Sequence, residues 1–260
     1  MLALLSPAKR LDYETPVAPA HSALATTPVF MARAAELINI LKTHSPRQVA
    51  QLMDLSDELA ALNVARNGAW RPRNTVLNSR PAVLAFNGDV YEGLQAASLS
   101  AEDLAWAQRH LALLSGLYGV LRPMDRLQPY RLEMGSKLAN PAGPDVVRYW
   151  GTSIALELRK RLRGHAQRCV VNLASQEYFS AVDVHALGVP VVDCAFEEGR
   201  AGQFKVVSFF AKRARGLMAR WMVTQRCETP DQLRGFCDEG YVLDQAASTA
   251  RRLVFRRATV

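Results

Sequence analysis

The sequence places Leu-Ala-Leu-Leu-Ser-Pro-Ala-Lys at residues 2–9, and the fold is worked out from this segment. Four apolar residues followed by Ser-Pro are typical of a short buried strand that ends at a turn. Lys9 follows the carboxyl end of this strand, where α/β sheets open their ligand crevices. We therefore expect a buried first strand with a lysine beside a crevice.

Outward from this strand, apolar patterning predicts both strands and helices along the whole chain. The expected strands are 82–86, 169–173, 189–196 and 204–209, with edge strands at 241–243 and 253–256. The expected helices are 28–42, one beginning at Ser45-Pro46, 56–64, 101–114, 145–163 and 209–226, with loops at 13–25 and 71–80. The elements mix without a strict βαβ rhythm. This pattern predicts one α/β (mixed α+β) domain over residues 1–260, with a mixed sheet wrapped by helices.

The composition is that of a globular protein, with 49% hydrophobic and 22% charged residues among 260. No apolar stretch approaches the roughly 20 residues that a membrane-spanning helix needs. The first residues lack a basic segment, and their apolar run stops after Leu5, so we expect no signal peptide. A cytoplasmic location without a membrane partner is the expectation.

The cysteines give no sign of a metal site or a disulfide framework. Cys169, Cys194, Cys227 and Cys237 form no C-x-x-C pair, and no histidine stands at ligand spacing from them. We expect mostly buried free thiols, no bound metal and no cofactor. Peroxide sensing by one of them would need an exposed thiolate of low pKa, which the sequence does not reveal.

Basic residues are concentrated at the end of the chain. Residues 200–260 contain 12 Lys or Arg and 5 Asp or Glu, an excess of +7, whereas residues 1–199 contain 20 and 19. This asymmetry suggests an anionic partner such as nucleic acid, although a solvated basic surface in an arginine-rich sequence remains open. On the helix expected at 209–226, apolar residues cluster on one side. The opposite arc carries Lys212, Arg213, Arg215, Arg220 and Arg226. A phosphate backbone or ordinary solvent would suit that face.

The run Leu-Ser-Gly-Leu-Tyr-Gly-Val-Leu at 114–121 has two glycines three residues apart. Gly116 and Gly119 would fit the turn of a helix-hairpin-helix, in which backbone N–H groups bind a phosphate and Arg122 follows. The alternative is a buried strand with glycine kinks, because residues 111–121 are very apolar.

Polar residues follow or interrupt several apolar runs and would converge on a pocket. Ser6 and Lys9 also match S-x-x-K, but the companion motifs of penicillin-recognising enzymes are absent. No pair has a spacing diagnostic of acid–base catalysis, and there is no phosphate-binding glycine loop, so no catalytic residue is assigned. The possible pocket residues are Ser6, Asp89, Tyr91, Glu133, Asn172, Ser175, Glu177 and Tyr178.

Several motifs together make the chain similar to the YaaA family of peroxide-stress resistance proteins. They occur in family order over nearly the whole chain, at 4–9, 88–91, 93–94, 114–123, 129–135, 172–175, 177–178, 211–212, 214–216 and 240–241. The resemblance implies an intracellular protein that protects against hydrogen peroxide and is linked to limiting free iron. It also implies a single α/β domain with a basic cleft, a helix-hairpin-helix element and DNA binding.

Within matched motifs, the resemblance places the basic cleft at Lys9, Arg131, Lys212 and Arg215. Two positions depart from the family pattern. Arg10 stands where Thr is usual, and Asn87 stands where Lys is common, so a cleft contact near position 87 is in doubt.

The leading expectation is binding of double-stranded or structured DNA through its backbone, without sequence readout and without an obligate protein partner. The expected contacts are Lys9, Gly116, Gly119, Arg122, Arg131, Lys212, Arg213, Arg215 and Arg220. The alternative is an enzyme acting on a nucleotide or a nucleic-acid base. That alternative requires Ser6, Lys9, Asp89, Arg131 and Glu177 to meet in one cavity.

Overall fold

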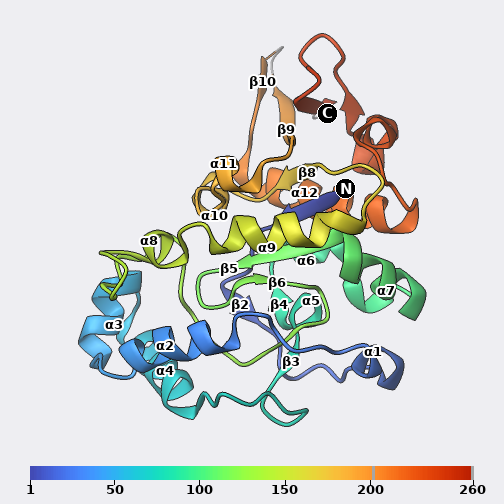
Figure 1. Ribbon diagram of the computed structural model, residues 1–260. Helices are drawn as coiled ribbons and strands as arrows, with labels where there is room; N and C mark the ends of the chain where they lie inside the picture. Colours follow the sequence, from blue (N-terminus) through green and yellow to red (C-terminus); the bar gives the residue numbers. More distant parts are fainter. Residues whose placement is uncertain (201–202, 259–260) are drawn as a thin grey trace.

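A mostly parallel sheet forms the centre of the protein in a computed structural model that describes residues 1–200 and 203–258 (Figure 1). Five neighbouring strands run parallel, and the strands at the two ends pair antiparallel. In spatial order the strands are β11 (Val242–Leu243), β12 (Arg252–Ala258), β9 (Val191–Arg200), β8 (Val170–Leu173), β1 (Leu2–Leu5), β5 (Leu111–Ser115) and β6 (Gly119–Leu121). A further strand, β10 (Gln203–Lys205), pairs with β9. The expected mixed α/β architecture is confirmed.

Helices cover the sheet and fill one end of the molecule. In Figure 1, α9 crosses in front of the sheet, and the helices of the first quarter of the chain lie at the end remote from β10. The helices are α1 (Pro19–Ala23), α2 (Met31–Leu41), α3 (Pro46–Met53), α4 (Asp57–Ala69), α5 (Ala82–Ala85), α6 (Asp89–Leu94), α7 (Ala101–His110), α8 (Val146–Trp150), α9 (Ser153–Arg161), α10 (Gln176–Phe179), α11 (Val184–Leu187) and α12 (Ser208–Thr224). Short 3-10 turns are η1 (Ala96–Ser98), η2 (Leu162–Gly164), η3 (Pro230–Gly235) and η4 (Asp238–Gly240). Two small ladders join β2 (Arg10–Leu11) to β4 (Phe86–Asn87) and β3 (Arg80–Pro81) to β7 (Arg126–Leu127).

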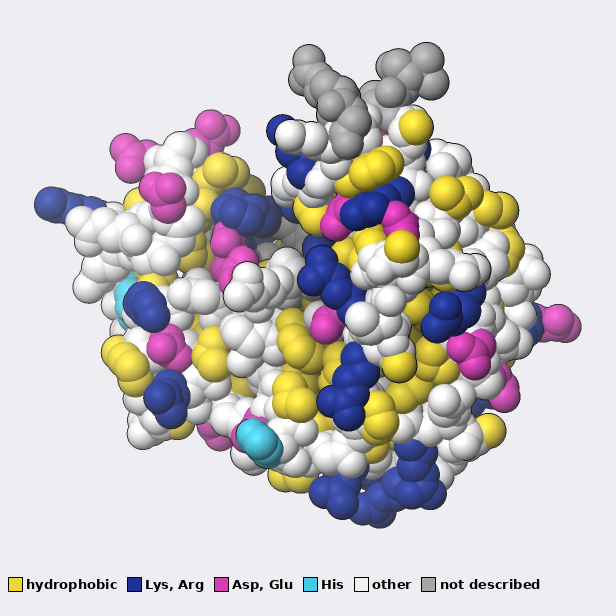
Figure 2. Space-filling view, turned by 90° about the horizontal axis from the view of Figure 1, so that it is seen from above, with side chains coloured by type: hydrophobic (Ala, Val, Ile, Leu, Met, Phe, Trp, Pro, Cys, Tyr) yellow, Lys and Arg dark blue, Asp and Glu magenta, His cyan; other side chains and the backbone are white. Residues whose placement is uncertain are grey.

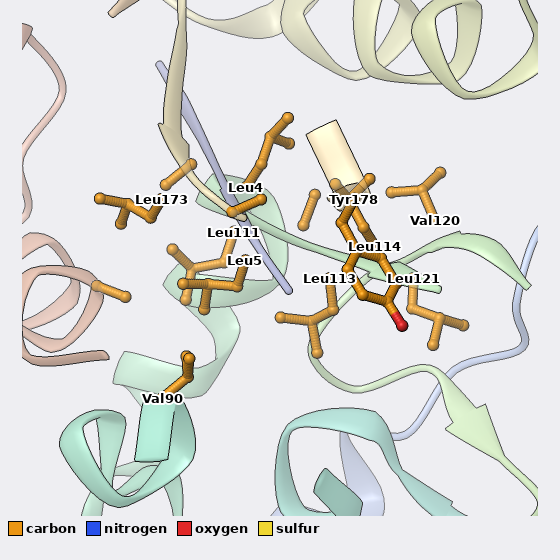
Figure 3. Packing of buried hydrophobic residues seen from close by; sticks show 14 of the residues in the cluster. Leu4, Leu5, Val90, Leu111, Leu113, Leu114, Val120, Leu121, Leu173 and Tyr178 are labelled. Carbon is orange, nitrogen blue, oxygen red and sulfur yellow. The ribbon is translucent and has the colours of Figure 1, made fainter. Parts of the chain in front are cut away.

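Strand β1 lies in the interior of the sheet, as its apolar sequence predicted. Leu5 pairs in register with Leu173 of β8 and with Leu113 of β5, and all of β1 is buried. Figure 3 shows Leu4 and Leu5 near Leu111 of β5 and Leu173 of β8, with Val90 of α6 below them and Tyr178 of α10 beside Leu114 and Leu121. A strand buried on both faces reads as a continuous apolar run, which is why the sequence identified it.

Several expected elements end elsewhere or differ in type. The predicted strand at 82–86 is mostly the short helix α5, and the predicted helix at 101–114 ends at His110, where β5 begins. The predicted helix at 145–163 is broken at Gly151, whose φ of 49° a helix does not contain. Short apolar runs do not distinguish strand from helix, and tertiary pairing decided these segments.

The last strands also differ in place from the expectation. Strand β10 stops at Lys205, because the chain enters α12 at Ser208. β11 lies at the edge of the sheet as expected, but β12 lies inside it between β11 and β9. Within the described ranges, no helix combines the length and the apolarity that crossing a membrane requires.

Helices α6 and α12 cross in direct backbone contact, and this contact positions both walls of the cleft described below. Gly216 of α12 faces the backbone of Val90 and Leu94, and Gly93 of α6 faces the backbone of Leu217. A Cβ at Gly216 would lie 2.8 Å from the carbonyl carbon of Val90, closer than side-chain packing tolerates. Glycine is required at this crossing because only a residue without a side chain allows so close an approach.

Candidate functional site

Two serines meet at the carboxyl ends of the neighbouring parallel strands β1 and β8. The Ser175 backbone N–H donates to Ser6 Oγ at 2.8 Å, and Ser6 Oγ lies 3.3 Å from Ser175 Oγ. Ser175 also caps α10 by accepting a hydrogen bond from the Tyr178 N–H. The parallel pairing of the strands brings these residues together although they lie 169 positions apart. This edge of the sheet is where α/β folds place ligand sites.

A cleft of about 450 Å³ opens at this edge. Its walls come from the segments after β1 and β8, from β4 and α6, from residues 130–133 and from α12. Its charged lining residues are Lys9, Arg10, Arg131, Lys212, Arg215, Asp89, Glu133 and Glu177. Its other lining residues include Ser6, Asn87, Tyr91, Tyr130, Leu132, Ser175 and Tyr178. All four residues of the expected basic cleft line it. Of the eight expected pocket residues, only Asn172 does not.

Glu133 joins two of the cations of the cleft. Its Oε1 atom lies 3.2 Å from Lys9 Nζ and 3.0 Å from an Arg131 terminal nitrogen. Lys9 is thus held by a carboxylate, and no hydrogen bond joins it to Ser6 within the described residues. Since Ser6 Oγ is engaged with Ser175 instead, the geometry of a Ser-Lys nucleophile is not formed here.

Arg215 and Lys212 enter the cleft from α12 and differ in their surroundings. Lys212 is exposed at the rim, whereas Arg215 is largely buried. Among the residues that the structure describes, neither has an acidic partner, and Arg215 Nε is buried without a hydrogen bond. Burial lowers the pKa of the Arg215 guanidinium. The nearby Cys194 thiol supplies no charge, because burial raises its pKa to about 12.

Three tyrosines form the uncharged part of the cleft wall. The Tyr91 hydroxyl donates to the Ser6 carbonyl oxygen at 3.0 Å, and the Tyr130 hydroxyl lies 2.6 Å from Ser115 Oγ. Burial raises the pKa of Tyr91, Tyr130 and Tyr178 above the usual range, so all three stay neutral at physiological pH. All three line the cleft as mostly buried, uncharged residues.

Two departures from the family pattern lie opposite each other. Arg10 of β2 pairs in register with Asn87 of β4, and both residues line the cleft. A cation of the neighbouring strand thus stands opposite position 87, and its guanidinium lies 3.8 Å from a Glu92 carboxylate oxygen. Sequence reasoning assigned no role to Arg10, although its place beside Lys9 was the available signal.

The expected basic face on α12 is wrong as a continuous surface. Arg213 pairs with Glu239 at 2.9 Å, and Arg226 pairs with Asp103 at 2.8 Å. Arg220 donates to the carbonyl oxygens of Leu94 and Gln95 at 3.1 and 3.2 Å, and to the Ser98 Oγ atom at 3.0 Å. On the side of the molecule that Figure 2 shows, Lys and Arg lie in separate groups, with Asp and Glu beside some of them. The helix itself contains no acid, but distant segments supply the partners.

The expected helix-hairpin-helix turn at Gly116 and Gly119 is also wrong. These glycines connect β5 to β6, which form an antiparallel hairpin, and both are buried. A Cβ at Gly116 would lie 2.9 Å from the Leu132 carbonyl carbon, so the close approach is to protein backbone rather than to phosphate. The alternative of a buried strand with glycine kinks is the correct one.

A hairpin of two helices does occur where α3 and α4 pack together. The connection passes through Asp54, whose φ of 50° is left-handed, and α4 begins with Asp57 and Glu58. These three acidic residues are exposed, so the connection between the two helices carries negative side chains.

Two further predicted site residues lie outside the cleft. Arg122 pairs with the buried Asp125 at 3.0 Å, and Asn172 donates to Asp193 at 2.8 Å. Their polar groups are thus engaged by the protein itself, and nothing places them beside the cleft.

The cysteines are free, with Cys169, Cys194 and Cys227 buried and Cys237 exposed. In the part of the chain that the structure describes, no three His, Cys, Asp or Glu side chains gather as a metal site would require.

Comparison with known proteins agrees with the sequence motifs. Residues 1–247 match the family described as peroxide stress protein YaaA. A UPF0246 protein of Albidiferax ferrireducens is 60% identical over 257 residues, covering 99% of this chain and 98% of the relative. A UPF0246 protein of Delftia acidovorans is 57% identical over 261 residues, covering 100% of this chain and 99% of the relative. The family description supports a role in peroxide stress, and the chain belongs to the YaaA family of peroxide stress proteins.

Proposed function

We propose that this protein binds DNA through the phosphate backbone, without sequence readout, as its contribution to peroxide stress resistance. The observation that carries the proposal is the cleft, where five cations line one cavity with three carboxylates. Lys212 at its rim has no acidic partner among the described residues. Exposed cations without partners attract polyanions, and phosphate contacts release counterions when they form.

The rim cations are the expected contacts with duplex backbone. Lys9, Arg10 and Lys212 are exposed, so a duplex lying across the opening would reach them. Lys9 and Arg10 come from the segment after β1 and have acidic partners in Glu133 and Glu92. Lys212 comes from α12 and has no acidic partner among the described residues, so it is the rim cation with uncompensated charge. This arrangement replaces the α12 face and the Gly116 turn as the proposed DNA contact surface.

The test is fluorescence anisotropy with a labelled duplex, measured over a series of salt concentrations. Lys212→Ala should weaken binding similarly for unrelated sequences and reduce the log–log salt slope by about 0.9, the value for one phosphate contact. Arg213→Ala is the matched control from the next position of α12. Its guanidinium is neutralised by Glu239, so the slope should stay near that of the parent protein. Equal slopes for the parent and Lys212→Ala would refute the proposal for this rim.

A second candidate function is an enzyme acting on a nucleotide or a nucleic-acid base. The observation that favours it is that Ser6, Lys9, Asp89, Arg131 and Glu177 do line one cavity. Incubation with oligonucleotides and with nucleoside phosphates, followed by mass spectrometry, would detect a released base, a cleaved strand or a lost phosphate. Failure to convert any of them under conditions in which they bind would leave binding as the function.

A further inference from the structure

The size of the cleft limits what can occupy it. Its volume of about 450 Å³ falls within the range of small-molecule pockets, roughly 300–1,000 Å³. A duplex, whose major groove alone is about 12 Å wide, is too large for such a cavity and can only lie across its mouth. A single nucleotide is of suitable size. The cleft therefore has room for one unit of a strand beyond the contacts that its rim makes.

Arg215 is the cation of the cleft whose charge is least compensated. It is largely removed from water, it has no ion pair within the described ranges, and its Nε is buried without an acceptor. A desolvated cation is costly unless an anion accepts its hydrogen bonds. A guanidinium presents several N–H groups in a fixed plane, which matches two oxygens of a phosphate. Arg215 is therefore suited to hold a phosphate group.

Arg131 extends this anion site on another wall. Its side chain is only 15% exposed, and its Nε is also buried without a partner, although a terminal nitrogen contacts Glu133. The charge of Arg131 is thus partly balanced by Glu133, and Arg131 lines the same cavity as Arg215. Two partly buried arginines from separate segments of the chain thus line one cavity.

The remaining wall suits a base and a sugar. Tyr91, Tyr130, Tyr178 and Leu132 line the cavity although each is mostly buried, so together they form an apolar wall against which a planar group can pack. Base–aromatic stacking tolerates any base, because every base has a π-face. Asp89 is only partly exposed and adds a carboxylate acceptor for an amino or hydroxyl group. The lining thus combines a phosphate end with an aromatic end.

We propose that this cleft holds a single nucleotide unit, with its phosphate on Arg215 and its base against the tyrosines. The nucleotide can come from a DNA strand or from free solution, and only the first of these cases rests on the proposed DNA binding. A strand can supply the unit by turning one nucleotide out of the helix, at a cost that is least where the base is unpaired. A free nucleoside monophosphate carries the same chemistry.

Binding of a nucleotide that belongs to a DNA strand is tested with a duplex that contains one unpaired 2-aminopurine, whose fluorescence reports a change in stacking. Binding of a free nucleotide is tested with deoxyadenosine 5′-monophosphate, by calorimetry and by competition against the 2-aminopurine signal. We expect the signal to change at saturating protein and the mononucleotide to reverse it. Since a charged hydrogen bond contributes about 1.5–3 kcal/mol, Arg215→Met should weaken mononucleotide binding about tenfold or more.

Matched variants separate the deep site from the rim. Arg215→Met should weaken binding of the bulged duplex more than binding of the fully paired duplex. Lys212→Met should weaken binding of both duplexes by the same factor. Arg215→Lys keeps the charge without the planar fork, so its mononucleotide affinity should fall between those of Arg215→Met and the parent. Melting temperatures of all variants show whether the fold is kept. If Arg215→Met does not fold, Arg215→Lys with the mononucleotide decides the matter.

The outcomes distinguish this inference from the proposed function. Binding of both duplexes with an unchanged 2-aminopurine signal and no mononucleotide binding would overturn the nucleotide site and leave DNA binding intact. Binding of the mononucleotide without any duplex binding would support the nucleotide site and overturn the proposed DNA function. Equal effects of Arg215→Met and Lys212→Met on every probe would overturn the assignment of Arg215.

Discussion

Replacing Gly216 by Ala should destabilise the protein, because the added methyl group would collide with backbone rather than with a movable side chain. The new Cβ would lie 2.8 Å from the Val90 carbonyl carbon and 2.9 Å from the Leu94 nitrogen, and closer still to the Val90 oxygen. Helices α6 and α12 would have to move apart along their whole crossing. Overpacking of this kind costs about 3 kcal/mol, and the better helix propensity of Ala returns about 1 kcal/mol. The expected net loss is about 2 kcal/mol.

Urea denaturation followed by circular dichroism measures this loss, and Gly68→Ala is the control. Gly68 lies inside α4, and a Cβ there would meet nothing within 4 Å. With no collision, the same substitution should stabilise by about 0.5–1 kcal/mol. The two variants should therefore differ by about 3 kcal/mol. The packing argument is refuted if Gly216→Ala unfolds within about 0.5 kcal/mol of the parent protein, the range of neutral surface substitutions.

Three more predictions follow from buried or exposed single residues. Gly116→Ala should lower the free energy of unfolding by about 2 kcal/mol, because its Cβ meets the Leu132 carbonyl carbon at 2.9 Å; an unchanged urea midpoint would contradict this. Burial, with a smaller effect of His165, lowers the pKa of His110 from 6.5 to about 4, so the unfolded chain binds the proton more readily. Stability should fall by about 3 kcal/mol from pH 6.5 to pH 4, and denaturation of His110→Phe across that range should show a flatter profile. Cys237, the exposed cysteine of the described chain, should react first with a thiol reagent, and Cys237→Ser should remove that fast phase in a stopped-flow titration.

Sequence patterning alone determined the elements whose signals are local. The buried strand β1 is a continuous apolar run, and the capped starts of α3 and α4 follow from Ser45 and Ser56. Polar residues that follow or interrupt apolar runs were predicted to share a pocket, and all of them but Asn172 line the cleft. The end of a buried strand fixes the position of the side chains that follow it. The place of such residues at the edge of the sheet is therefore predictable from sequence.

Only the tertiary structure decided which cations are available for a ligand. Arg213 and Arg215 are two positions apart on α12, yet Arg213 is neutralised by Glu239, whereas Arg215 is partly buried and has no acidic partner among the described residues. The Gly116 turn likewise became a strand hairpin, because β5 found its pairing partners in β1 and β6. Charge balance and strand pairing depend on residues far away in the chain, and periodicity contains no information about such partners.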